Sequence, residues 1–534
     1  MKTSAVEIAG SQLAAFLEEA RRIVGAEHVA TDEATCRLMS VDFSEIALER
    51  AAAVVRPAST AEVSALAQAA CRHQVPLIPR GGGMSYTLGY APARPGSVML
   101  DMRGMNKILS IDLDNLTLTV EPGVTWAEIH AALLPTGYRV GFMGTMSGIQ
   151  ATVGGGLGNN ATGHGRGDIG DDLLGMEVVL PDGRIIQTGG RATSPALPVN
   201  RGYGPDFTGV FIHDSGAFGI KTKATFRLQR RPQGTAFVCY GFRDLTAMVD
   251  GLCAAERLGV AATNMAFSDY HHRVFSEQKP TAAEKQAMLR AIVASAPNKL
   301  ALVRHLVTLA LSRNMSFLKK WPYSTFSMVD AFDQASANRG ARALAAEMRR
   351  FGGAPLNQSL GIVMRAEPFM PIDKLIVGRE GECSFPSNFV VPLTKGQELV
   401  AACDDFFARN QRAMAAHGVT WTKIFLVAKG QFGLEPIIYW QDRMNPLRYS
   451  VLSDGNRDKW GTRPDRAEAR AFAVDLRRRL AEALEPFHPF HFQTGKYYRY
   501  RDALASAAEW DLVDGFKSLI DPPRLINPGA LGLT

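Results

Sequence analysis

The sequence predicts an α+β fold of at least two domains, and three observations carry this prediction. A chain of 534 residues is too long for one hydrophobic core. Between about residues 51 and 230, short β-branched runs alternate with helical patterns and with Gly or Pro stops. After Arg231 and Pro232 the pattern changes to longer helical stretches with occasional strands, which indicates a second domain.

The elements of the first domain can be assigned in order. We expect strands in the short apolar runs bounded by Gly, Pro or polar residues, namely 51–57, 75–80, 97–102, 107–112 and 117–123. The intervening stretches 60–74 and 125–135 have helical spacing. The block 175–190, GMEVVLPDGRIIQTGG, is typical of a β-hairpin with a Pro-Asp-Gly turn.

Composition excludes several classes of protein. The hydrophobic fraction of 46%, the charged fraction of 21% and the net charge of +7 fit a globular protein whose basic residues are too dispersed for nucleic-acid binding. The six cysteines form no CxxC pair, which argues against a zinc module and favours a reducing compartment. Residues 1–22 resemble an amphipathic helix rather than a signal peptide, so we expect a cytoplasmic protein.

One basic segment has two interpretations. From 285 to 329 the chain has no acidic residue, and apolar runs are interrupted by Lys285, Arg290, Lys299, Arg304, Arg313, Lys319 and Lys320. The segment could dock on anionic lipid, at the inner face of a membrane, or on an electron-carrying partner. We favour an ordinary core-facing helix pair with a basic outer face, since most amphipathic helices in globular domains are of that kind.

Two glycine-rich stretches predict a site for an anionic, planar ligand. Pro79 to Ser85, PRGGGMS, follows an apolar strand, and its successive glycines can turn N–H groups inward as an anion nest. Gly141 to Asp168 combines many glycines with small hydroxyl and amide residues that can bind a ligand lying on the main chain. The GxGxxG at 165–170 leads into a strand rather than a helix, so we reject a Rossmann site.

These motifs resemble a known family. PRGGGMS, VEPGVTW, TVGGGLGNNATG, EVVLPDG, SGAFGIKTKATFRL and the closing DPPRLINPG stand in the order seen in the vanillyl-alcohol oxidase and p-cresol methylhydroxylase superfamily, which includes D-lactate and glycolate dehydrogenases. The resemblance implies a PCMH-type FAD-binding domain of two α/β subdomains with an α+β cap. It divides the chain into an N-terminal helical segment (1–45), the FAD domain (46–232), the cap (233–485) and a C-terminal segment that returns to the FAD domain (486–534).

The resemblance also implies the FAD contacts. It places the pyrophosphate on the first glycine loop, and flavin and adenine on the second stretch and the start of a later strand. The implied residues are Arg80, Gly81, Gly82, Gly83, Met84, Ser85, Thr145, Gly148, Gly154, Gly155, Asn159, Gly163, Gly219 and Ile220. Some relatives attach FAD through a His where this chain has Met84, or through a cap His or Tyr. We therefore expect non-covalent FAD, with Tyr439, His271 and His272 as alternative tethers.

A catalytic wall is expected near the C-terminus. His488 to Tyr500, HPFHFQTGKYYRY, gathers histidines, tyrosines and cations. We expect Arg499 or Lys496 to hold an anion, Tyr498 to donate a hydrogen bond and His491 to act as general base. The alternative is that the tyrosines pack in the core and the cations are solvated.

Comparison with the phenol-oxidising relatives adds two residues. Their acid near flavin N5 would correspond to Asp168, and their tyrosine in the first glycine loop to Tyr86 if a small length difference is allowed. The D-2-hydroxy-acid dehydrogenases share the glycine loop more closely, but their HGDGNxH metal motif is missing from this sequence, so we expect no metal.

The predicted function is FAD-dependent oxidation of a small organic substrate at a CH–OH or benzylic carbon, such as a 2-hydroxy acid or a 4-substituted phenol. Oxygen, a cytochrome or a quinone could take up the electrons, and a homodimer fits the superfamily. Two alternatives remain: an NAD(P)H-fed reductase on the same fold, and a FAD-binding protein whose cap is an interaction or membrane-docking module.

Overall fold

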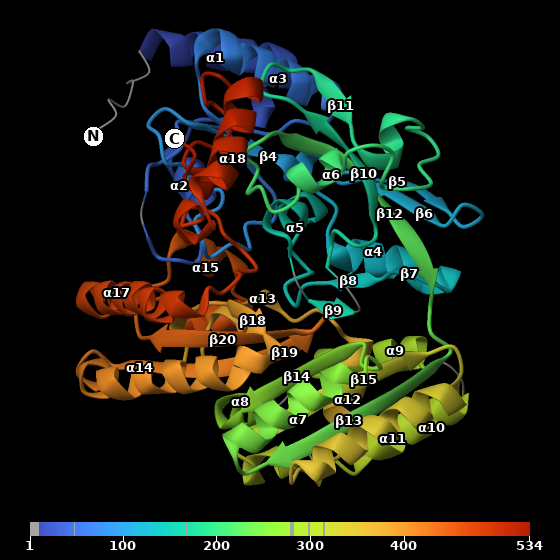
Figure 1. The fold of residues 1–534 in the computed structure, drawn as a ribbon. Helices are drawn as coiled ribbons and strands as arrows, with labels where there is room; N and C mark the ends of the chain where they lie inside the picture. The colour runs from blue at the N-terminus through green and yellow to red at the C-terminus, as the bar shows by residue number, and fades with distance from the viewer. Residues whose placement is uncertain are drawn as a thin grey trace.

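The computed structural model describes residues 10–46, 48–161, 163–165, 168–277, 282–296, 299–312 and 315–534. The upper half in Figure 1 holds two sheets built by residues before about 230, together with the C-terminal helix α18 (Ala507–Ile520). The lower half holds one larger sheet with helices on its faces. This arrangement confirms the predicted α+β class.

The first sheet has the strand order β1-β2-β4-β3, in which β2 and β3 are both parallel to β4. Apolar side chains of α1 and α3 share one core with these strands. The elements are α1 (Gly10–Val24), β1 (Val29–Ala30), α2 (Glu33–Ser40), β2 (Ala53–Val55), α3 (Thr60–His73), β3 (Leu77–Arg80) and β4 (Val98–Asp101). The topology places Arg80 at the carboxyl end of a parallel strand, where the first glycine loop begins.

The second sheet is antiparallel, with the order β11-β10-β12-β6-β5, and β7 pairs with β12. The expected hairpin is present, because β10 and β11 pair antiparallel across the Pro-Asp-Gly turn. The elements are β5 (Ile108–Asp112), β6 (Thr117–Val120), α4 (Trp126–Leu133), β7 (Tyr138–Val140), β8 (Phe142–Gly144), α5 (Val153–Asn159), β9 (His164–Gly165), β10 (Leu173–Val179), β11 (Ile185–Gln187), α6 (Phe207–Val210) and β12 (Ile220–Arg230). The glycine-rich stretch 141–168 thus contains a short helix that the sequence did not predict.

The third sheet is antiparallel, in the order β16-β13-β15-β14-β19-β20-β17, and β18 also pairs with β20. Helices α7, α11, α14 and α17 share the core on one face, and α9, α10 and α12 lie on the other. The strands are β13 (Gly234–Phe242), β14 (Thr263–Ser268), β15 (Tyr323–Ala331), β16 (Ala354–Pro355), β17 (Cys383–Pro386), β18 (Phe389–Pro392), β19 (Val419–Ala428) and β20 (Gln431–Trp440). The helices are α7 (Leu245–Arg257), α8 (Asp269–Glu277), α9 (Ala282–Ser295), α10 (Lys299–Ala310), α11 (Gln334–Arg350), α12 (Ser359–Ala366), α13 (Ile372–Ile376), α14 (Gly396–Ala416), α15 (Pro446–Val451), α16 (Asp454–Trp460) and α17 (Ala467–Leu484).

The C-terminal residues lie against the first two sheets. The amide of Leu77 in β3 donates to the carbonyl of Leu525, and the amide of Asn527 donates to the carbonyl of Leu77. Ile520 and Phe516 of α18 pack in the core of the second sheet. Among the described residues, no helix is both long and apolar enough to cross a bilayer.

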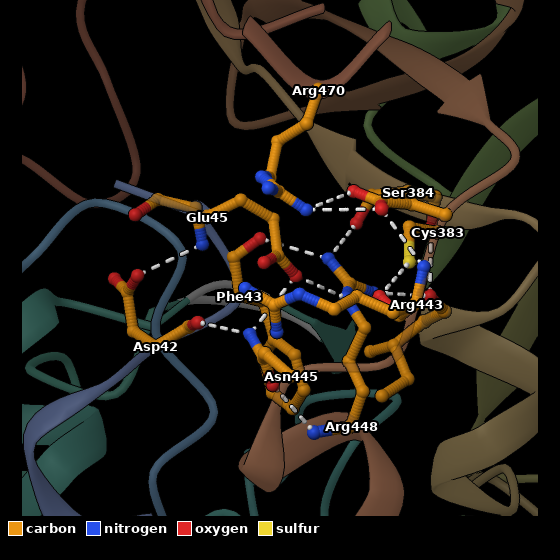
Figure 2. A network of polar contacts seen from close by, with 12 residues as sticks. Asp42, Phe43, Glu45, Cys383, Ser384, Arg443, Asn445, Arg448 and Arg470 are labelled. Carbon is orange, nitrogen blue, oxygen red and sulfur yellow. Dashed lines mark hydrogen bonds and ion pairs between the residues drawn. The ribbon is translucent and has the colours of Figure 1, made fainter. Parts of the chain in front are cut away.

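A buried arginine joins the segment after α2 to the third sheet. Arg448 is fully buried, and its guanidinium donates to the carboxylate of Glu45 (2.8 Å) and to the carbonyl of Phe43 (2.9 Å). It also donates to the carbonyl of Ser384 (Figure 2) and to the carbonyl of Ile376. One side chain therefore binds three separate parts of the chain.

Candidate cofactor and substrate site

A groove crosses the upper half of the molecule where the two glycine-rich stretches meet. Their backbones approach so closely that a Cβ atom on Gly82 would lie 1.8 Å from the carbonyl oxygen of Gln150. The side-chain amide of Gln150 also donates to the carbonyl of Gly82 (2.7 Å). Glycine is required here by the packing of two backbones, and it leaves a concave surface free of side chains.

Most of the cofactor residues predicted from the sequence line this groove, namely Arg80, Gly81, Gly82, Gly83, Met84, Ser85, Thr145, Gly154, Gly155, Asn159 and Gly219. Three others lie elsewhere. Gly148 lies under Phe369, whose ring is 2.3 Å from the position of a Cβ, Gly163 lines a neighbouring cavity, and Ile220 is buried in the core of the first sheet. The groove also contains residues that the sequence did not single out, among them Tyr90, Thr152, Ser215, Lys221 and Gln493.

Arg80 gives the groove a positive charge. Its guanidinium lies 4.8 Å from the ring centre of Tyr90, and within the described part of the chain it makes no ion pair. Among the described residues, the Nε of Arg80, the Oγ1 of Thr152 and the Oε1 of Gln493 are buried without a hydrogen-bond partner. Unpaired buried polar atoms are costly. The first two can donate to an anionic oxygen such as that of a pyrophosphate, and the amide oxygen of Gln493 can accept from a hydroxyl or N–H group of the ligand.

Tyr86, the residue that follows the first glycine loop, belongs to a buried polar cluster. The cluster is centred on Asn388, which is fully buried and immediately precedes β18. The side-chain amide of Asn388 donates to the hydroxyl of Tyr86 (3.1 Å), and its backbone amide donates to the hydroxyl of Tyr498 (3.4 Å). Nδ1 of His491 lies 2.6 Å from the carbonyl oxygen of Asn388. Since a carbonyl only accepts, Nδ1 carries the proton and Nε2 is free to accept one.

Arg477 supplies the cation of this cluster. Its side chain is buried and donates to the carbonyl of Tyr86 (2.8 Å) and to Oγ of Ser387 (3.2 Å), while the guanidinium lies 4.1 Å from the ring centre of Tyr497. Within the part of the chain that the structure describes, its Nη2 atom has no hydrogen-bond partner. An unpaired guanidinium N–H inside the protein can bind an anionic oxygen of a ligand.

Glu435 is the acidic residue of this cluster. The alternation of side chains along β20 determines which face of the sheet it lies on. Phe432, Leu434 and Ile438 pack in the core under α14 and α17, so Glu435 points to the opposite face of the sheet. There it meets Tyr86, which donates a hydrogen bond to it. Burial raises the pKa of Glu435 to about 7, against the lowering effect of that hydrogen bond.

Comparison with known proteins supports an FAD site in this groove. Residues 51–189, which include the first glycine loop and part of the second stretch, match the family described as FAD binding domain. The chain carries an FAD-binding domain. The unpaired polar atoms of the FAD groove fit this cofactor.

The relatives and the solved structures extend the similarity. The chain is 31% identical over 272 residues to the probable mitochondrial D-lactate dehydrogenase of Danio rerio, covering 50% of this chain and 52% of the relative. It is 35% identical over 185 residues to glycolate oxidase subunit GlcD of Bacillus subtilis, covering 34% of this chain and 37% of the relative. The chain thus matches about half, or less, of the length of these relatives.

Two solved structures show the same fold over nearly the whole chain. Substrate-bound p-cresol methylhydroxylase has a TM-score of 0.74 at 17% identity and 98% coverage of both chains. A 4-ethylphenol oxidase from Gulosibacter chungangensis has a TM-score of 0.67 at 17% identity and 99% coverage of both chains. The expected α+β, PCMH-type fold is confirmed.

The predicted catalytic residues are not all brought together. His491 and Tyr498 belong to the Asn388 cluster. Arg499 points outward with 66% of its side chain exposed, and its acidic neighbours are Glu485 and Asp502. Asp168 forms an ion pair with Lys429 in the turn between β19 and β20 (3.0 Å), where both side chains are about one-third exposed.

Lys496 is not available as an anion holder, which corrects one sequence-based alternative. Its Nζ donates to Oδ1 of Asn527 (2.6 Å) and to the carbonyls of Gly89 (3.2 Å) and Leu88 (3.4 Å), so it ties the C-terminal segment to the FAD domain. Burial lowers the pKa of Lys496 to about 7.

The alternative cofactor tethers are buried cap residues. His272 uses both ring nitrogens, on the carbonyl of Trp321 (2.8 Å) and the hydroxyl of Ser324 (2.7 Å). His271 lies 3.4 Å from Oγ of Ser268, and Tyr439 packs its ring against Tyr270. Because both ring nitrogens of His272 are hydrogen-bonded within the cap, this residue is not free to bind a cofactor. Non-covalent attachment of FAD stays a prediction.

Proposed function

We propose that the protein is an FAD-dependent oxidoreductase that oxidises a CH–OH or benzylic carbon of a small organic substrate. The single observation that carries this proposal is Glu435, a carboxyl group with a pKa of about 7 that meets Tyr86, the residue next to the FAD loop. A proton acceptor is most effective when its pKa is near the working pH. The relatives named D-lactate dehydrogenase and glycolate oxidase act on CH–OH groups, which supports the same reaction class.

The residues of the cluster have distinct tasks in this proposal. Bound FAD supplies the acceptor for two electrons and a proton, transferred as a hydride. Glu435 accepts the hydroxyl proton of the substrate. The free Nη2 of Arg477 and the hydroxyl of Tyr498 bind the anionic or phenolic oxygen and orient the reacting carbon, while Tyr86 positions Glu435.

The substrate is a 2-hydroxy acid or a 4-substituted phenol in this proposal. A carboxylate would pair with Arg477, and a phenolate would accept from Tyr498 as well. The final electron acceptor in this proposal is oxygen, a cytochrome or a quinone, and the working location is the cytoplasm.

The test is the flavin absorbance of the holoprotein during anaerobic addition of D-2-hydroxy acids, 4-alkylphenols and benzylic alcohols. One class should bleach the flavin in the wild type. The Glu435→Gln variant should retain FAD, but the substrate should reduce its flavin at least about a hundredfold more slowly. This is the usual range for the loss of a general base. Glu398→Gln serves as the control, because Glu398 pairs with Lys395 on the surface of α14.

Two outcomes would overturn the proposal. Bleaching by NADPH but by none of these substrates would indicate a reductase. Equal reduction rates in Glu435→Gln and in the wild type would remove Glu435 from the reaction.

A further inference from the structure

Helix α10 is apolar on two opposite faces. Ala301, Leu302, His305 and Leu309 face inward and pack in the core beneath β13, β14 and β15. The sequence favoured an ordinary helix with a basic outer face. The structure differs, because the outer face carries large apolar side chains as well.

The outer stripe is strongly exposed. Leu300, Val303, Val307 and Leu311 follow one another at intervals of three or four residues and are 81%, 58%, 53% and 71% exposed. This spacing places them on one side of the helix. Large apolar side chains on both faces of a helix are normally buried on both faces. The exposure of this stripe therefore indicates a surface that contacts a partner.

Helix α9 shows the same pattern. Met288 and Ala291 pack inward, whereas Leu289 and Val293, four residues apart, are 47% and 51% exposed. Both helices lie in the lower half of Figure 1, with α10 at its right-hand edge and α9 nearer the upper half.

The charges within the segment 285–329 have one sign, because it includes no acidic residue. The first turn of α9, just before this segment, contains Glu284. Lys299 and Arg304 on α10 and Lys285 and Arg290 on α9 are exposed, as is Lys320 at the end of the following short helix. Apolar side chains surrounded by long cations are the composition of interfacial helices, whose apolar face enters the lipid while the cations reach the headgroups.

We propose that α9 and α10 form a docking surface for an anionic lipid membrane, defined by Leu289, Val293, Leu300, Val303, Val307 and Leu311. A second copy of the chain fits less well. In a twofold dimer the same patch meets itself, which would bring basic residues against basic residues. Anionic headgroups complement this charge, and each nearby cation contributes to binding.

The experiment is co-sedimentation of the holoprotein with lipid vesicles. We expect binding to phosphatidylcholine vesicles that contain phosphatidylglycerol, weaker binding to pure phosphatidylcholine, and release by salt. Leu300→Asp combined with Val307→Asp should weaken binding at least about tenfold, because two apolar side chains no longer enter the lipid. Lys299→Gln and Arg304→Gln should each weaken it about fivefold at low salt.

Leu519→Asp is the matched control, because Leu519 is 77% exposed on α18, outside the patch. It should bind like the wild type, and all variants should retain FAD. Equal sedimentation of wild type and Leu300→Asp/Val307→Asp with anionic vesicles would overturn the proposal. A wild-type dimer that dissociates in the same variant, with no binding to vesicles, would show that a second copy covers the stripe.

Discussion

The imidazole of His491 lies flat against the phenol ring of Tyr498, with ring centres 3.5 Å apart and an angle of 10° between the planes. Both side chains are also bound to Asn388, one to its carbonyl and the other to its amide. Asn388 therefore holds both rings in the stacked arrangement. Burial lowers the pKa of His491 to about 4, which keeps the imidazole neutral at physiological pH.

The pH dependence of flavin reduction distinguishes two candidate bases. If Glu435 accepts the proton, kcat/KM should rise with pH through an inflection near 7, the value set by its burial. The inflection should persist in His491→Phe, which preserves the stacking on Tyr498, and should vanish in Glu435→Gln. An inflection near 4 would instead assign the reaction to His491.

Arg477 should control substrate binding. Arg477→Met removes the free Nη2, and hydrogen bonds to charged groups contribute about 1.5–3 kcal/mol, so we expect KM to rise about ten- to a hundredfold. Arg477→Lys retains the positive charge, so its KM should rise less than that of Arg477→Met. The control is Arg478→Met on the same helix, where Arg478 pairs with Asp475 and Glu482 at the surface. An unchanged KM in Arg477→Met with normal FAD content would contradict this role.

Two glycines of the FAD groove should respond differently to substitution. A Cβ on Gly155 would have one neighbour, Oγ1 of Thr152 at 3.4 Å, so Gly155→Val should fold but fill the groove and lose FAD. A Cβ on Gly82 would meet backbone at 1.8 Å, so Gly82→Ala should destabilise the fold itself. Thermal unfolding of the apoproteins separates the effects, and normal FAD content in Gly155→Val would contradict this placement of the ligand.

Local patterns predicted much of the FAD domain. The expected strand over 75–80 corresponds to β3, and the expected helix over 60–74 to α3 (Thr60–His73), because apolar periodicity and Gly or Pro stops act within a few residues. Helix α5 escaped prediction because Gly154, Gly155 and Gly156 have low helix propensity. Its conformation depends on packing against the rest of the domain.

The substrate site was harder to predict because its residues come from distant segments. Arg477 stands in a run of three arginines, and only its position four residues after Ala473 and three before Leu480 on the inner face of α17 distinguishes it. Glu435 is an acid inside an otherwise apolar strand, which is a usable sequence indication. The sequence suggested that the adjacent residues Tyr498 and Arg499 face one site. In the structure Tyr498 belongs to the buried cluster and Arg499 points outward, because neighbouring side chains need not face the same cavity.

Arg448 should be essential for joining the cap to the N-terminal segment. Arg448→Met removes its four hydrogen-bonding contacts and leaves the buried carboxylate of Glu45 without its cation, with only the amide of Asn445 still donating to it among the described residues. We therefore expect a loss of about 3–5 kcal/mol in the free energy of unfolding. Arg443→Met is the control, because Arg443 meets Asp465 in an exposed pair worth less than about 1 kcal/mol. Equal denaturation midpoints would contradict the structural role.

Buried neutral histidines should make the protein sensitive to acid. His271 is 8% exposed, and burial lowers its pKa from 6.5 to about 3. Below pH 6.5 the unfolded imidazole binds a proton that the folded one does not bind until about pH 3, so the free energy of unfolding falls as the pH drops through this window. His271→Gln removes the group that binds this proton in the unfolded state. It should therefore reduce the slope of the free energy of unfolding against pH by up to about 1.4 kcal/mol per pH unit in this window. Denaturant unfolding at a series of pH values measures both slopes, and identical slopes in His271→Gln and the wild type would show that His271 does not remain neutral in the folded protein.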